Sequence, residues 1–162
     1  MSGPVLGIDP GTAVTGYGVV EPEPGRPGRL VECGVIRTNR RGVLAHRLAT
    51  LYDGVVQLLE RHHPSTLAIE SVFYANNVRT TVVLGHARGV ILLAAAQAGV
   101  AVAEAAPASI KKIIVGRGAA EKIQVAYMVQ QLLRLKRPPT PADAADGVAV
   151  ALAHLLGRRT FR

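Results

Sequence analysis

Short apolar runs alternate with longer stretches of helical periodicity along this chain, and this order most strongly limits its possible folds. Residues 5–8, 66–69 and 100–103 form apolar runs with the length of buried strands. Residues 43–62 and 78–98 lie between them and carry apolar side chains at helical spacing. Strands joined through helices pair in parallel. The sequence therefore predicts an α/β domain built around a central sheet.

Two further strands are expected near the N-terminus, at 16–20 and 30–36, with a Pro- and Gly-rich loop at 21–28 between them. They follow the first strand closely enough to pair in hairpins, so the predicted sheet is mixed and has five strands. Three more helices are expected at 107–115, 119–135 and 141–156. We expect one domain over residues 1–157 and a short basic tail at 158–162, suited to seeking a polyanion.

The net charge points to a polyanionic partner. Lys and Arg number 19 against 11 Asp and Glu, which gives a formal charge of +8 and a pI near 10.4. The N-terminus lacks the cationic and apolar pattern typical of a signal peptide, and we expect no run that spans a bilayer. We therefore expect a cytoplasmic protein without a membrane partner, and a single cysteine excludes an intrachain disulfide.

Four acidic residues occupy positions that a solvated surface does not explain. Asp9 and Glu70 each end an apolar strand, while Asp143 and Asp146 lie in an alanine-rich segment. Adjacent parallel strands would bring Asp9 and Glu70 to one edge of the sheet, where ligand crevices in α/β folds open. A helix starting near Pro141 would place the other two acids on one face, because residues three apart are neighbours there.

A cluster of these four carboxylates would need a cation. Each close pair repels by on the order of 4 kcal/mol at an effective dielectric of about 20, which is comparable with the stability of a whole domain. Oxygen ligands without a His or Cys cluster favour Mg²⁺ or Mn²⁺. A pair of such ions can stabilise the attacking and leaving oxygens of a phosphodiester.

Each acid also has a structural explanation. Asp9 before Pro-Gly is typical of a turn, and Glu70 before Ser71 can start a loop. Asp143 fits a helix-capping box and favours the helix dipole, so its assignment as a metal ligand is the least secure. Asp146 lies past the capping turn, where such an explanation is weaker.

Several motifs in order give the chain a resemblance to one family. They are GIDPGT at 7–12, TGYG at 15–18, AIESVF at 68–73, LGHARG at 84–89, VGRGAAEK at 115–122 and ADAAD at 142–146. Together they cover almost the whole chain, and they resemble the RuvC family of bacterial Holliday junction resolvases, the crossover junction endodeoxyribonucleases.

The resemblance implies a ribonuclease H-like fold and a homodimer that cuts four-way DNA junctions by paired symmetric nicks in recombination and repair. It also implies two Mg²⁺ ions per active site, for which Mn²⁺ can substitute, and partnership with the RuvA–RuvB branch-migration complex. The family's acidic positions fall on Asp9, Glu70, Asp143 and Asp146. Some members carry His where Asp143 stands here.

The resemblance also marks candidate DNA-binding residues. Phe73, with Tyr74 beside it, matches an aromatic residue that stacks against bases at the junction, and aromatic stacking contributes about 1–3 kcal/mol per base. Lys111 and Lys122 match basic residues near the scissile phosphate, and Lys122 is also expected to be catalytic. Lys112 is an adjacent alternative to Lys111, and Asn76, Asn77 and Arg79 form a polar stretch suited to base or backbone contacts or to a plain loop. Weaker candidates for backbone contacts are Arg37, Arg40, Arg41 and Arg88, and the polyanion-seeking tail carries Arg158, Arg159 and Arg162.

Two other functions compete with the nuclease. The GIDPGT motif also resembles the first phosphate loop of actin-like and sugar-kinase phosphotransferases, but those proteins need two such domains and this chain holds one. A DNA-structure-binding module without activity could use the same basic surface. However, carboxylates beside phosphate would hinder such a module unless metal bound there.

Overall fold

A computed structural model describes residues 3–71 and 76–162 of the chain. Its central sheet has five strands, β1 (Val5–Asp9), β2 (Val14–Glu23), β3 (Arg26–Arg37), β4 (Thr66–Glu70) and β5 (Ala101–Ala105), in the order β3-β2-β1-β4-β5. β2 pairs antiparallel with β1 and β3, whereas β4 pairs in parallel with β1 and β5. This is the mixed five-stranded sheet that the sequence predicts.

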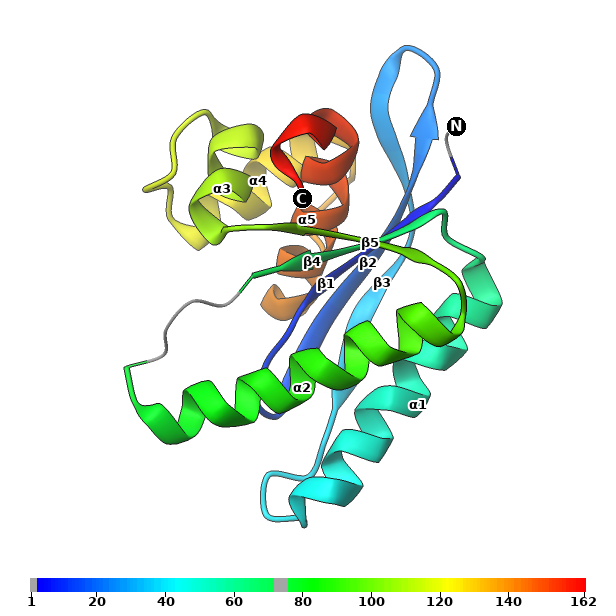
Figure 1. Ribbon diagram of the computed structural model, residues 1–162. Coiled ribbons are helices and arrows are strands. Elements are labelled where there is room, and N and C mark those ends of the chain that lie inside the picture. The colour runs from blue at the N-terminus through cyan, green and yellow to red at the C-terminus, as the bar shows by residue number, and fades with distance from the viewer. Residues whose placement is uncertain (1–2, 72–75) are drawn as a thin grey trace.

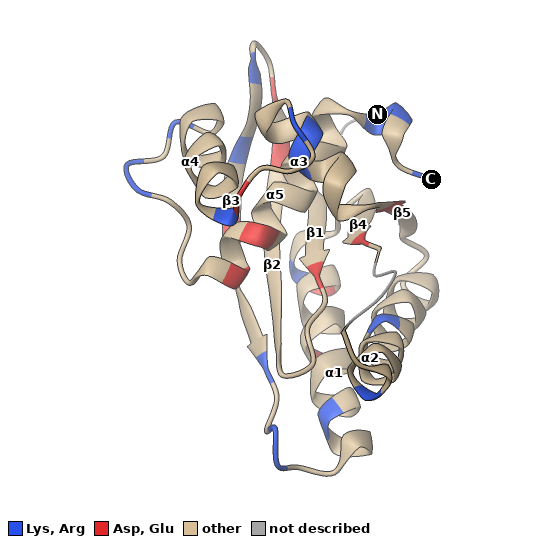
Figure 2. Cartoon of the chain, turned by 90° about the vertical axis from the view of Figure 1, so that its left-hand side faces the viewer, with Lys and Arg blue, Asp and Glu red and all other residues tan. Residues whose placement is uncertain are grey.

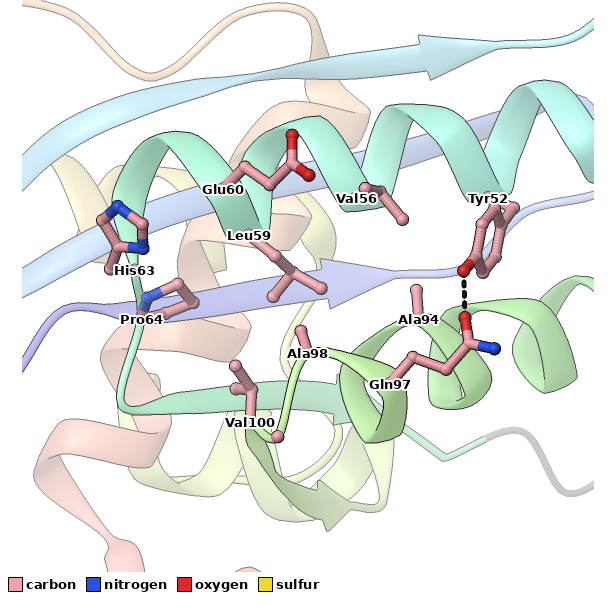
Figure 3. Close-up of a pocket in the computed structure, with 11 residues that line it drawn as sticks. Tyr52, Val56, Leu59, Glu60, His63, Pro64, Ala94, Gln97, Ala98 and Val100 are labelled. Atoms are coloured by element: carbon pink, nitrogen blue, oxygen red, sulfur yellow. Dashed lines mark hydrogen bonds between the residues drawn. The ribbon is translucent and has the colours of Figure 1, made fainter.

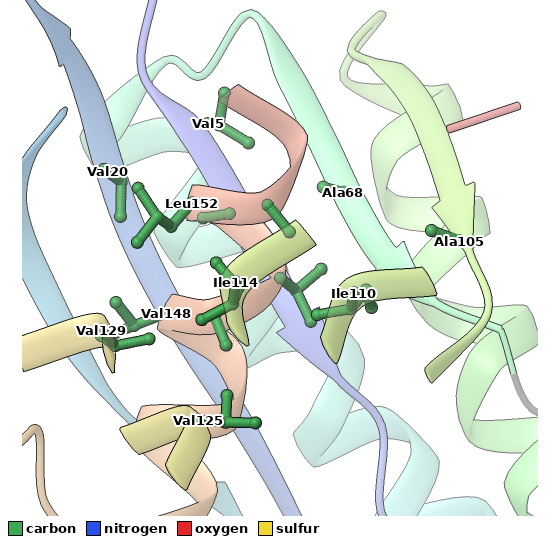
Figure 4. Close-up of a cluster of buried hydrophobic side chains, with 14 of the residues drawn as sticks. Val5, Val20, Ala68, Ala105, Ile110, Ile114, Val125, Val129, Val148 and Leu152 are labelled. Atoms are coloured by element: carbon green, nitrogen blue, oxygen red, sulfur yellow. The ribbon is translucent and has the colours of Figure 1, made fainter. Parts of the chain in front are cut away.

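Helices cover both faces of this sheet (Figure 1). One face carries α1 (Leu44–His62) and α2 (Val78–Gln97). The other carries α3 (Pro107–Val115), α4 (Lys122–Leu132) and α5 (Ala142–Leu156), followed by a short 3-10 helix, η1 (Arg158–Thr160). Each face has its own apolar core, and Figure 4 shows the one under α3, α4 and α5. Leu6 and Leu67 belong to the core under α1 and α2, and both are fully buried.

The expected loop at 21–28 is wrong, because most of it is strand. β2 and β3 continue past it as a long hairpin in which Glu21 faces Arg29 and Glu23 faces Arg26. The register shifts between Glu21 and Glu23, which lets Pro22 fit where a regular ladder would need its N–H. Only the turn remains as a loop, with Gly25 at a φ of 75° that suits glycine.

The basic tail expected at 158–162 packs against the rest of the domain. Phe161 is buried in the core under α3, α4 and α5, and its ring meets that of His154 edge to face at a centroid distance of 4.9 Å. Arg162 exchanges two backbone hydrogen bonds with Glu104 of β5, 2.8 and 3.0 Å long. Burial of the aromatic ring and pairing with an edge strand hold the segment, although the side chains of its three arginines stay exposed.

One element contradicts the expectation that no run could span a bilayer. In the described part of the chain, α2 has 20 residues and a mean hydropathy of 1.3, so it is long and apolar enough by length and composition. One such helix is weak evidence for a membrane span. Ala87, Ile91, Ala94 and Ala95 of this helix are buried against the sheet, as in the core helices of globular proteins.

Candidate active site

Two parallel strands bring the first two acids together. β1 ends at Asp9 and β4 ends at Glu70, and the two strands pair in parallel up to Ile8 and Ile69. Pro10 follows Asp9 and has no N–H with which to extend the ladder, so the strands separate beyond this point. Asp9 and Glu70 therefore lie side by side at the carboxyl edge of the sheet, where the crevice of an α/β fold opens.

Helix α5 brings the other two acids over the same edge. This helix crosses β1 and β2 closely because glycines line the contact. A Cβ atom on Gly7 would lie 2.3 Å from the backbone nitrogen of Ala151, and one on Gly147 would lie 2.5 Å from the Cα of Tyr17. Asp143 and Asp146 are in the first turns of this helix, so the close packing fixes their positions relative to the ends of the strands. Figure 2 shows acidic segments on α5, β1 and β4.

A cleft of about 160 Å³ lies where these elements meet. Three acids and two lysines line it: Asp9, Glu70, Asp146, Lys111 and Lys122. Asp143 does not line the cleft, but its charge still acts on Asp9 and Lys122. The structure thus places three of the four predicted acids in one cleft and the fourth at its margin.

The electrostatics show how strongly these acids interact. Burial, and then the charges of Glu70 and Asp146, raise the pKa of Asp9 to about 8. Burial and the charge of Asp146 also raise the pKa of Glu70, while a hydrogen bond from Asp9 opposes that rise. Asp9 therefore keeps its proton at neutral pH when no cation is bound, and the proton relieves the repulsion between the acids.

Lys122 places a positive charge directly beside Asp146 in the cleft. It is the first residue of α4, and its Nζ donates a hydrogen bond of 2.8 Å to Oδ2 of Asp146. That hydrogen bond raises the pKa of Lys122, so this side chain stays charged. Lys111 of α3 lines the same cleft, and its positive charge opposes the rise in the pKa of Glu70. The neighbouring Lys112 is exposed and does not line the cleft.

The donor set suits a hard divalent cation, because every acidic side chain here offers carboxylate oxygens. No three His, Cys, Asp or Glu side chains among residues 3–71 and 76–162 stand ready to hold a metal ion. The contacts explain this: Asp9 and Glu70 are hydrogen-bonded to each other, and Asp146 is paired with Lys122. A cation would replace a proton and an ammonium group that already occupy these oxygens.

Comparison with known proteins identifies the family of this site. The family model of the crossover junction endodeoxyribonuclease RuvC matches residues 5–154. The chain belongs to the RuvC family. The protein of this name from Halorhodospira halophila is 52% identical over 150 residues, which cover 93% of this chain and 88% of that protein.

Solved structures of RuvC proteins confirm the predicted ribonuclease H-like fold. RuvC from Thermus thermophilus in complex with a Holliday junction substrate has a TM-score of 0.91 and 34% identity, covering 97% of this chain and 95% of that one. The yeast mitochondrial Holliday junction resolvase Ydc2 has a TM-score of 0.66 at 13% identity, over 96% of this chain and 80% of that chain. The yeast likeness supports the fold alone.

The predicted DNA-binding residues between 73 and 79 are only partly described. Phe73 and Tyr74 lie outside the described residues. Asn76 and Arg79 are exposed near the N-terminus of α2. Asn77 caps that helix, because its Oδ1 accepts a hydrogen bond of 2.8 Å from the backbone N–H of Thr80. Its side chain thus has a structural partner that the sequence did not reveal.

Arg88, one of the weaker candidates for a DNA-backbone contact, has two protein partners. Its guanidinium donates to the carboxylate of Glu104 and, at 3.3 Å, to the backbone carbonyl of Glu70. The helical spacing of Arg88 relative to buried residues of α2 could have indicated these protein contacts from the sequence. Arg88 lies three residues before the buried Ile91 and next to the buried Ala87, so it is on the side of α2 that faces the sheet.

A larger cavity of about 570 Å³ lies away from this site, between the C-terminal halves of α1 and α2 (Figure 3). Its walls are mostly apolar, with Val56, Leu59 and Ala94 among them, and Tyr52 donates a hydrogen bond to Gln97 at one end. Glu60 is the only carboxylate in its lining. This cavity lacks the paired acids that phosphodiester chemistry needs.

Proposed function

We propose that this chain resolves four-way DNA junctions by paired symmetric nicks, hydrolysing phosphodiester bonds in homologous recombination and DNA repair. One observation carries the proposal: three acids from β1, β4 and α5 line a single cleft with two lysines, in a member of the RuvC family. The net charge of +8 provides attraction to the phosphate backbone. The T. thermophilus relative solved with a Holliday junction supports the choice of substrate.

The cofactor proposed here is Mg²⁺, with two ions per active site and Mn²⁺ as a substitute. Asp9, Glu70 and Asp146 would hold the ions, and Asp143 would join from the margin of the cleft. When bound, the ions would supply Lewis acidity toward the attacking water and the leaving oxygen. The carboxylates must be deprotonated to bind, so proton release from Asp9 would accompany loading.

The two lysines then have separate positions beside the substrate. Lys122 would turn from Asp146 toward the scissile phosphate and stabilise the charge that develops there. Lys111, on the opposite wall formed by α3, would hold a phosphate oxygen. Phe73 stays proposed for base stacking on the resemblance, and Tyr74 could share that role. Asn76, Asn77 and Arg79 stay proposed for base or backbone contacts, and Lys112 as an alternative to Lys111.

A homodimer is proposed through the exposed face of α2. Val78, Val82, Gly85, Gly89 and Leu93 follow one another at spacings of four, three, four and four residues, which places them on one helical face. Val78, Val82 and Leu93 are 81%, 53% and 50% exposed, and a Cβ on either glycine would meet nothing within 4 Å. An unpaired apolar face of this kind suits a second copy of the chain, and two copies would supply two cuts.

Action in the cytoplasm and cooperation with the RuvA–RuvB complex are proposed on family membership.

The test is a cleavage assay on synthetic four-way, three-way and linear duplex DNA, with and without Mg²⁺. We expect symmetric nicks only in the four-way substrate and only with the metal. Asp146→Asn should abolish cleavage and retain junction binding, because the fold and the basic surface persist. Asp53→Asn is the matched control, because this exposed aspartate lies on α1 away from the cleft. Metal-dependent cutting by Asp146→Asn would remove the assigned site.

A further inference from the structure

We propose that Arg88 and Glu104 form a clamp that positions Glu70 in the cleft, a role that rests on the proposed nuclease function. The guanidinium of Arg88, on α2, donates to the carboxylate of Glu104 on β5 and to the backbone carbonyl oxygen of Glu70 on β4. Three elements thus meet at one side chain. Arg88 touches the backbone of a candidate metal ligand without lining the cleft itself.

The backbone of Glu70 needs this donor because the sheet cannot supply one. The Ser71 N–H donates to Ala105 of β5, and the carbonyl of Glu70 belongs to the same trans peptide unit, so it points to the other side, toward β1. The register Ile8 with Ile69 would place Pro10 opposite Ser71, and Pro10 has no N–H to donate. An unpaired carbonyl at this half-buried position would cost free energy, and Arg88 removes that cost.

The Glu104 half of the clamp is held in place by the C-terminal segment of the chain. Glu104 exchanges backbone hydrogen bonds with Arg162, so the end of the chain is paired with the strand that carries the partner of Arg88. The side chain of Arg88 is 19% exposed, so solvent screens this ion pair less than an exposed one. The planar guanidinium can serve both acceptors at once, which a lysine ammonium cannot do in the same geometry.

The position of the clamp gives it a function beyond stability. The carboxylate of Glu70 is repelled by Asp146, and repulsion of this kind pushes the strand end outward unless the backbone is fixed. Arg88 also joins the end of β4 to the body of α2. Loss of the clamp should therefore loosen the ligand more than the fold.

The experiment compares Arg88→Gln, Arg88→Lys and Glu104→Gln with the parent protein and with Arg29→Gln. Arg29 is a matched control, because it also pairs with a glutamate, Glu21, but on the β2–β3 hairpin away from the cleft. Three quantities are measured on each: Mn²⁺ affinity by calorimetry, junction affinity in Ca²⁺, and single-turnover cleavage at saturating Mg²⁺.

We expect Arg88→Gln to weaken Mn²⁺ binding by about tenfold and to slow cleavage by 10-fold to 100-fold, within the range that loss of outer-shell partners produces. Junction affinity should change less than twofold. Glu104→Gln should show a smaller loss of the same kind, Arg88→Lys should recover part of it, and Arg29→Gln should match the parent.

Two results would overturn the clamp. If Arg88→Gln weakens junction binding and leaves Mn²⁺ affinity unchanged, Arg88 is a phosphate contact. If it lowers the melting temperature while Mn²⁺ affinity and cleavage per folded molecule stay at parent values, the role is structural only. Failure of the proposed function is a separate outcome: the parent would then not cut the junction, while the comparison of Mn²⁺ affinities would still decide the clamp.

Discussion

At the scale of one residue, the pKa of Asp9 shows how strongly burial and the other acids of the cleft disfavour its negative charge. Asp9 ends a buried strand, and its neighbours Glu70 and Asp146 are acids, so its proton is retained to about pH 8. The sequence predicted the gathering of these acids from strand ends and an alanine-rich segment. It did not predict that Lys122 would pair with Asp146, because the two residues are 24 positions apart in the sequence and no pattern between them indicates the contact.

This charge makes stability depend on pH when metal is absent. In the unfolded chain Asp9 releases its proton near its ordinary pKa of 3.8, whereas burial and the neighbouring acids raise the pKa to about 8 in the folded chain. The folded state therefore binds the extra proton in this window, and the free energy of unfolding should fall as pH rises, by up to about 1.4 kcal/mol per pH unit.

Urea denaturation in chelator at pH 5, 6, 7 and 8 measures this slope. Asp9→Asn carries no titrating group and should remove most of the decline, so that the variant is more stable than the parent at pH 8. Equal slopes for the two proteins would mean that Asp9 titrates in the folded chain as it does in water.

At the scale of the element, helix α5 determines where Asp146 lies in the cleft. Its glycine-lined contact with β1 lets the helix backbone approach the sheet closely, which sets the position of Asp146. A Cβ on Gly7 would lie 2.3 Å from the nitrogen of Ala151 and 2.4 Å from the carbonyl oxygen of Gly147, and neither backbone atom can move freely.

Gly7→Ala should therefore destabilise the protein by about 1–3 kcal/mol or more, because the helix must shift away from the sheet. It should also weaken Mn²⁺ binding, because Asp146 moves with α5. Chemical denaturation measures the change in stability, and a Gly7→Ala variant as stable as the parent would contradict the close contact.

The elements also show what periodicity can predict. The β1, β4 and β5 strands and α1 to α3 were expected within a few residues, because their apolar patterns are regular. Regions whose structure depends on distant partners were missed. The β2–β3 hairpin runs through prolines because a register shift accommodates them, and the C-terminal segment is held by the edge of β5.

Assembly is the question at the scale of the whole molecule. The exposed apolar face of α2 is the surface proposed to join two copies, and a charge there would be buried on association at a cost of several kcal/mol. Val82→Glu should therefore convert a dimer to a monomer without loss of folding, since this side chain is 53% exposed in the single chain.

Sedimentation equilibrium of the parent and of Val82→Glu tests this assembly. Val43→Glu is the matched control, because Val43 is 64% exposed at the start of α1 and lies outside the proposed interface. A parent protein that stays monomeric at working concentration, or a Val82→Glu variant that stays dimeric, would contradict the assignment of α2.

The central claim is that acids from β1, β4 and α5 form one site for divalent cations. Anomalous diffraction from crystals soaked with Mn²⁺ tests it most directly. We predict metal peaks at about 2.0–2.2 Å from carboxylate oxygens of Asp9, Glu70 and Asp146, with Lys122 turned away from Asp146. Peaks elsewhere, with the Asp146 to Lys122 pair intact, would contradict it.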